Sequence, residues 1–105
     1  MIFEVENKKV FSSDIGQTFD KNKHTIILLH GSGQSHVVWS LTDQYLSDEG
    51  YNVLALDLPG HGNSEGSSLK TIENMADWLN KVVEVIGIKD LTISVSYTHL
   101  TLPTK

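Results

Sequence analysis

The sequence predicts an α/β fold in which parallel strands are joined by crossover helices. Three short apolar runs, at 25–29, 51–58 and 91–95, have the look of buried strands, and helical periodicity separates them twice. Short connections favour right-handed crossovers and a parallel sheet with helices on both faces. The 105 residues, 39% of them hydrophobic, are enough for one domain with one modest core.

The elements before residue 51 follow from local patterns. Apolar residues on either side of the polar stretch "ENKK" predict a hairpin over 2–13. The branched run 25–29 does not alternate with polar residues, which favours a strand buried on both faces. From about His36 to Glu49 a helix is expected, with its stop at Gly50. Its apolar residues, spaced by three and four, are Val38, Leu41, Tyr45 and Leu46.

The strongest helical pattern covers residues 72–86. Apolar residues lie on one face of this segment and polar residues on the other. Thr71 is the expected N-cap and Gly87 the expected C-terminal stop. Such a helix is roughly 22 Å long, sufficient to cover one face of a sheet. The strand before it is expected to end near Asp57.

Composition excludes several function classes. The formal net charge is −5, so no excess of basic residues is present to bind nucleic acid or an anionic membrane. The chain has no cysteine, no apolar run of membrane-spanning length and no signal-like start, so a cytoplasmic location is expected. The five histidines show no paired helical spacing, and neither a metal nor a cofactor is expected.

Two glycine-rich loops follow the first two parallel strands. The first begins with "HGSG" at 30–33 and the second is "DLPGHGNSEG" at 57–66. Open α/β sheets bind ligands at the carboxyl ends of their strands, where bare backbone N–H groups can approach an anion. The loops could cradle a phosphate or form an oxyanion hole, and an isolated pair of glycines could simply make a tight turn.

Taken together, the two motifs closely resemble those of the α/β-hydrolase family. In that family a His-Gly-x-x loop precedes the first crossover helix and a D-x-x-G-x-G-x-S turn follows the next strand. The resemblance covers roughly residues 1–93. It implies the N-terminal part of an esterase-like hydrolase that acts on a small-molecule ester-like substrate through a nucleophile–histidine–acid triad.

The resemblance also implies roles for individual residues. The oxyanion hole would take a backbone N–H from Ser32, with Gly33 next to it. The expected loop-support residues are His30, Gly31, Asp57, Gly60, Gly62 and Ser64. His61 is expected to be a solvated loop histidine, and Trp39 is expected to pack rather than to line a pocket.

The family's nucleophile elbow, G-x-S-x-G, is expected directly after the third parallel strand, where this chain reads "SVSYTHLTLPTK". The nucleophile position falls on Tyr97, beside Ser96, and no glycine lies nearby. His99 has no elbow to orient it. We therefore expect no catalytic residue in this chain, a non-family tail over 94–105 that is foreign sequence rather than a native edge strand, and self-association through an exposed sheet edge.

The main alternative is a fragment of a dinucleotide-binding oxidoreductase. "GSGQSH" contains the first two glycines of G-x-G-x-x-G, and Asp57 stands near the place of a ribose-binding acid. The third glycine, however, is replaced by His36. A non-catalytic interaction module is a third class, for which the expected sheet edge is the one positive feature.

Overall fold

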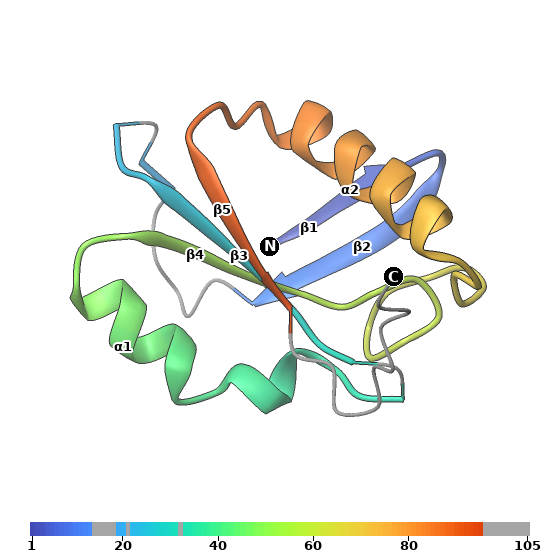
Figure 1. Cartoon of the computed structure of the whole chain (residues 1–105), viewed down its shortest axis with the longest axis horizontal. Coiled ribbons are helices and arrows are strands. Elements are labelled where there is room, and N and C mark those ends of the chain that lie inside the picture. Colours follow the sequence, from blue (N-terminus) through green and yellow to red (C-terminus); the bar gives the residue numbers. More distant parts are fainter. Residues whose placement is uncertain (14–18, 21, 32, 96–105) are drawn as a thin grey trace, which may run out of the picture.

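The computed structural model describes residues 1–13, 19–20, 22–31 and 33–95 (Figure 1). In these residues five strands form one sheet in the order β1-β2-β4-β3-β5, and helical segments lie on both of its faces. The elements are β1 Ile2–Val5, β2 Lys8–Ser13, β3 Thr25–Leu29, the 3₁₀ helix η1 His36–Trp39, α1 Thr42–Asp48, β4 Asn52–Leu56, α2 Ile72–Ile86 and β5 Leu91–Val95.

The predicted N-terminal hairpin is confirmed. β1 and β2 pair in antiparallel register, and the two turn residues, Glu6 and Asn7, have φ of 51° and 66°. Positive φ at both central residues is the backbone of the tight hairpin turn that matches strand twist. β2 also pairs antiparallel with β4, so the hairpin extends the sheet beyond its parallel part.

The three strands predicted as parallel are confirmed as parallel. β3 lies between β4 and β5, with Leu29 in register with both Leu56 and Val95. The three carboxyl ends therefore meet at one edge of the sheet, where the two glycine-rich loops begin. β5 is the last strand in the order, and Ile93 and Val95 on it are 38% and 41% exposed.

The core has two layers because residues of the buried strands alternate between the faces of the sheet. On one face α2 contributes the buried Trp78 and Val82, which pack against strand residues such as Leu54. On the other face Trp39 and Leu46 pack against a smaller cluster. That cluster consists of Leu28, Val53 and Ala55.

α2 has the predicted bounds and caps. The Thr71 hydroxyl accepts a hydrogen bond from the Asn74 N–H at 3.0 Å. Gly87 ends the helix in the left-handed conformation, with φ of 78°. Both ends are thus specified by residues within or beside the helix, which explains why its bounds could be read from the sequence.

The continuous helix predicted over 36–49 is wrong. The 3₁₀ helix η1 is followed by the separate α1, and α1 is followed by Gly50 at φ of 97°. Most of the predicted apolar face is exposed, Leu41 to 86% and Tyr45 to 63%. The physical reason is the hydrogen bond between His36 and Asp57, two residues that are 21 positions apart in the sequence. This contact begins the segment with tight turns in place of a regular amphipathic helix.

Across the described residues, no helix combines the length and the apolar character that crossing a membrane requires.

Candidate functional site

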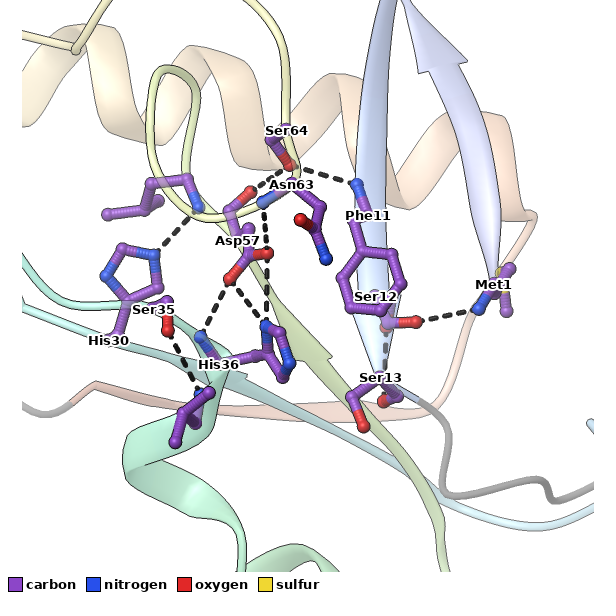
Figure 2. Close-up of polar contacts among 12 residues, drawn as sticks. Met1, Phe11, Ser12, Ser13, His30, Ser35, His36, Asp57, Asn63 and Ser64 are labelled. Carbon is purple, nitrogen blue, oxygen red and sulfur yellow. Dashed lines mark hydrogen bonds and ion pairs between the residues drawn. The ribbon is translucent and has the colours of Figure 1, made fainter.

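Two loops at the carboxyl edge of the sheet form the candidate site. We call residues 30–36 the first loop, after β3, and residues 57–66 the second loop, after β4. Figure 2 shows backbone and side-chain groups of both loops around Asp57, which directly follows β4. The parallel pairing of β3 with β4 places the loops side by side, because both strands end at the same edge.

Asp57 is fully buried, and its carboxylate binds both loops (Figure 2). Oδ1 accepts from the His36 backbone N–H at 2.7 Å and lies 2.9 Å from His36 Nδ1. Oδ2 accepts from the Asn63 N–H at 2.8 Å. A buried carboxylate needs such donors to replace water, so these contacts hold the first loop, the second loop and β4 together.

Ser64 connects the second loop to the hairpin. Its hydroxyl donates to the Asp57 carbonyl oxygen at 2.7 Å and accepts from the Phe11 N–H at 2.9 Å. Next to it, the Glu65 N–H donates to the Lys9 carbonyl, and Glu65 Oε1 accepts from the Lys9 N–H. The second loop is therefore bound to β2 as well as to β4.

The two glycines of the "GHG" segment are required for steric reasons. Gly60 has φ of +76°, and a Cβ there would lie 3.0 Å from the Ser68 backbone nitrogen. Gly62 has φ of +51°, and a Cβ there would overlap the Asp57 carboxylate. Without a side chain at position 62, the backbone can close around the buried carboxylate.

His30 is fully buried and bonded at both ring nitrogens. Nδ1 donates to the Gly31 carbonyl at 2.7 Å, and Nε2 accepts from the Leu58 N–H at 2.9 Å. These partners require the neutral ring with its proton on Nδ1, since Nε2 must accept. Burial lowers the pKa of His30 from 6.5, which favours the same neutral form.

His61 is not the solvated histidine that was predicted. Its side chain is partly buried, Nε2 accepts from the Gly33 N–H at 3.1 Å, and Nδ1 donates to the Pro59 carbonyl at 3.0 Å. The ring also lies beside that of His30, with 5.1 Å between the centroids. The second loop thus reaches the first through a histidine side chain as well as through Asp57.

Ser32, the expected oxyanion donor, lies outside the described residues. So do Ser96, Tyr97 and His99, at the place where the nucleophile elbow was expected but no catalytic residue was predicted. Gly33 is described: it has φ of +78°, and its N–H is the group bonded to His61. Gly31 is buried, with its N–H donating to Gln34 Oε1 at 2.9 Å.

Two residues of the site were missed by sequence reasoning. His36 and Asn63 both bind the Asp57 carboxylate, one from each loop. Neither has a local signal, because each contact depends on the chain returning to Asp57. The one indirect signal is Asp57 itself, since a carboxylate at the end of a buried strand needs nearby donors.

The geometry at Asp57 argues against the dinucleotide-binding alternative. A ribose-binding acid must offer free oxygens to the ribose hydroxyls. Here the carboxylate is fully buried and both oxygens already accept hydrogen bonds. His36, in the place of the motif's third glycine, is one of its partners. The alternative is therefore disfavoured, because the Asp57 carboxylate is engaged by the two loops.

Comparison with known proteins supports the resemblance to α/β-hydrolases that the two glycine motifs indicate. The model of the alpha/beta hydrolase fold family matches residues 24–95. Protein ABHD14A of Danio rerio is 39% identical over 67 residues, covering 61% of this chain and 25% of that protein. Pimeloyl-[acyl-carrier protein] methyl ester esterase of Proteus mirabilis is 38% identical over 61 residues, covering 58% of this chain and 23% of the esterase. The chain thus spans about a quarter of these relatives.

Solved structures share the fold. A predicted CIB-like hydrolase from Thermoplasma acidophilum superposes with a TM-score of 0.78 and 25% identity, covering 91% of this chain and 49% of that one. The esterase EaEST from Exiguobacterium antarcticum gives a TM-score of 0.71 at 21% identity, covering 88% of this chain and 33% of the esterase, a likeness of fold alone. The family match covers most of the chain and includes both glycine-rich loops. The chain therefore belongs to the α/β-hydrolase fold family.

Proposed function

We propose that this chain is the oxyanion-hole part of an esterase-like α/β-hydrolase. In this proposal the Ser32 backbone N–H donates to the oxyanion of an ester-derived tetrahedral intermediate, and Gly33 holds the loop next to it. Fixed backbone donors suit that role, because they need no reorganisation as negative charge develops. The nucleophile, the base and the acid are supplied by sequence that these 105 residues do not contain.

The hydrogen bonds of the residues on either side of Ser32 carry the proposal. His36 is bonded to the buried Asp57 carboxylate, and His30 is bonded to Gly31 and to the second loop. An oxyanion hole needs such preorganisation, because a donor misplaced by even 1 Å loses much of its effect. The similarity to a methyl ester esterase supports an ester as the proposed substrate class.

The chain by itself is expected to have no esterase turnover. The test incubates the purified chain with a fluorophosphonate probe and, separately, with a p-nitrophenyl ester. Neither covalent labelling nor hydrolysis above the Ser96→Ala variant is expected. Labelling that Ser96→Ala abolishes would show that the chain carries its own nucleophile.

A chimera tests the oxyanion role directly. Residues 24–93 would replace the matching segment of the Proteus mirabilis esterase, and kcat would be measured with a p-nitrophenyl ester. Ser32→Ala keeps the backbone N–H and should leave kcat nearly unchanged. Ser32→Pro removes it and should lower kcat by about 10²–10³, the usual effect of losing one oxyanion donor.

Circular dichroism shows whether each chimera is folded, so that a loss of rate is compared only between folded proteins. If the folded Ser32→Pro chimera retains the kcat of Ser32→Ala, the Ser32 N–H is not the donor and the proposal is wrong.

A further inference from the structure

The His61 ring bridges backbone groups of two loops that are far apart in sequence. Nε2 accepts from the Gly33 N–H in the first loop, and Nδ1 donates to the Pro59 carbonyl in the second. An amide N–H can only donate and a carbonyl can only accept. Both bonds therefore exist together only when the ring is neutral and carries its proton on Nδ1.

Gly33 is held by its neighbours as well as by His61. The Gln34 N–H donates to the Gly31 carbonyl at 3.1 Å, and Gln34 Oε1 accepts from the Gly31 N–H at 2.9 Å. The φ of Gly33, +78°, is one that glycine adopts without strain. The bond to His61 adds a contact that ties Gly33 to the second loop.

We propose that His61 is a positioning residue of the oxyanion loop, acting as a latch that its own protonation opens. The inference rests on the proposed function, since Gly33 adjoins the proposed donor Ser32. Protonation places a hydrogen on Nε2, which then faces the Gly33 N–H donor with another donor. The bond between His61 and Gly33 is then lost, whereas the other contacts of the first loop remain.

Other titratable groups lie near His30 and His61 in the described part of the chain. His30, after β3, lies ring against ring with it at 5.1 Å. Asp57, after β4, and His36, in η1, complete the cluster through their contact with each other. The test must therefore separate His61 from the other histidines.

Nuclear magnetic resonance of the full ¹⁵N-labelled chain tests the latch without any need for turnover. At about pH 8 His61 should show the Nδ1–H tautomer that its two hydrogen bonds require. A scalar coupling across the hydrogen bond should join the Gly33 nitrogen to His61 Nε2. On acidification the Gly33 amide shift should move with the midpoint of the His61 ring, and the coupling should disappear.

Two variants at position 61 and one remote control complete the design. His61→Gln offers an oxygen acceptor that does not titrate, so the pH dependence of the Gly33 amide should vanish while the amide stays protected from exchange. His61→Leu offers no acceptor, and the protection of the Gly33 amide should fall by about tenfold. His24→Gln, at the opposite end of β3, should leave the Gly33 titration unchanged.

The proposal is overturned if the Gly33 amide does not titrate, if it follows His30 or His36 instead, or if His61→Gln still shows the wild-type pH dependence. Should His61→Leu fail to fold, the comparison of wild type with His61→Gln decides alone. The outcome is independent of the chimera. If Ser32→Pro does not lower kcat in the chimera but the Gly33 amide titrates with His61, the oxyanion role is wrong. If Ser32→Pro lowers kcat but the Gly33 amide does not titrate with His61, only the role of His61 is wrong.

Discussion

Asp57 and His36 are joined twice, once through backbone and once through side chain. Asp57 Oδ1 lies 2.7 Å from the His36 backbone nitrogen and 2.9 Å from Nδ1 of the same residue. The His36 ring also lies 4.9 Å from that of Phe11, between centroids, so the pair is in contact with β2 as well. This relationship explains why the first loop stays against the second, and it leads to the first prediction.

Removing the Asp57 carboxylate should be far more damaging than removing the His36 ring. Asp57→Ala leaves buried donors without an acceptor and should lower the free energy of unfolding by about 3–5 kcal/mol. His36→Ala keeps the backbone donors and should cost about 1–3 kcal/mol. Urea unfolding of both variants and of the double variant measures the coupling. Strict additivity would contradict the contact, because bonded residues couple.

Gly62→Ala and Gly50→Ala form a matched pair. Both glycines have positive φ, which costs an alanine about 1–2 kcal/mol, but a Cβ at Gly50 meets nothing within 4 Å. At Gly62 the Cβ would overlap the Asp57 carboxylate, so the total cost there should be about 2–5 kcal/mol. Equal unfolding free energies for the two variants would show that the close approach to Asp57 has no energetic weight.

Acid should destabilise the chain through His30. Because burial lowers its pKa below 6.5 in the folded state, the unfolded chain binds the proton more tightly. The contribution of neutral His30 to the free energy of unfolding is fully present above pH 6.5. It declines as the pH falls below that value, by at most about 1.4 kcal/mol per pH unit. His30→Gln removes this linkage.

The measurement is the difference in unfolding free energy between wild type and His30→Gln, taken at several pH values on both sides of 6.5. The difference should narrow as the pH falls. Leu41→Gln, a change of an exposed residue that cannot titrate, should show a constant difference. A constant difference for His30→Gln as well would rule out the linkage.

The edge strand β5 should make the chain self-associate. β5 pairs with β3, stands last in the strand order, and presents the partly exposed apolar side chains of Ile93 and Val95. Ile93→Lys places a charge on this edge and should reduce association. Sedimentation velocity over a range of concentrations measures the effect. An unchanged association constant in Ile93→Lys would place the contact elsewhere.

Leu54 and Leu41 should differ sharply although both belong to predicted apolar patterns. Leu54 is 1% exposed in the core and Leu41 is 86% exposed. Leu54→Ala should cost about 2–5 kcal/mol, and Leu41→Ala should remain within about 0.5 kcal/mol of wild type. A large loss for Leu41→Ala in urea unfolding would mean that the segment packs as the continuous helix first predicted.

Elements whose signals are local were predicted well. β3 and α2 have the bounds expected from an unbroken apolar run and from the caps at Thr71 and Gly87. The segment 36–49 was predicted incorrectly as one continuous helix, because its first turn depends on a hydrogen bond between His36 and Asp57. Periodicity describes what a helix would bury, but it carries no information about an anchor 21 residues away.

The same division holds for the site. The two glycine motifs alone indicated the family and the residues of both loops. Only the tertiary structure decided that the buried Asp57 binds His36, that Gly62 must lack a side chain, and that His61 binds Gly33. The physical reason is that burial and hydrogen-bond partners arise between segments distant in sequence, whereas strands, caps and turns depend on neighbouring residues.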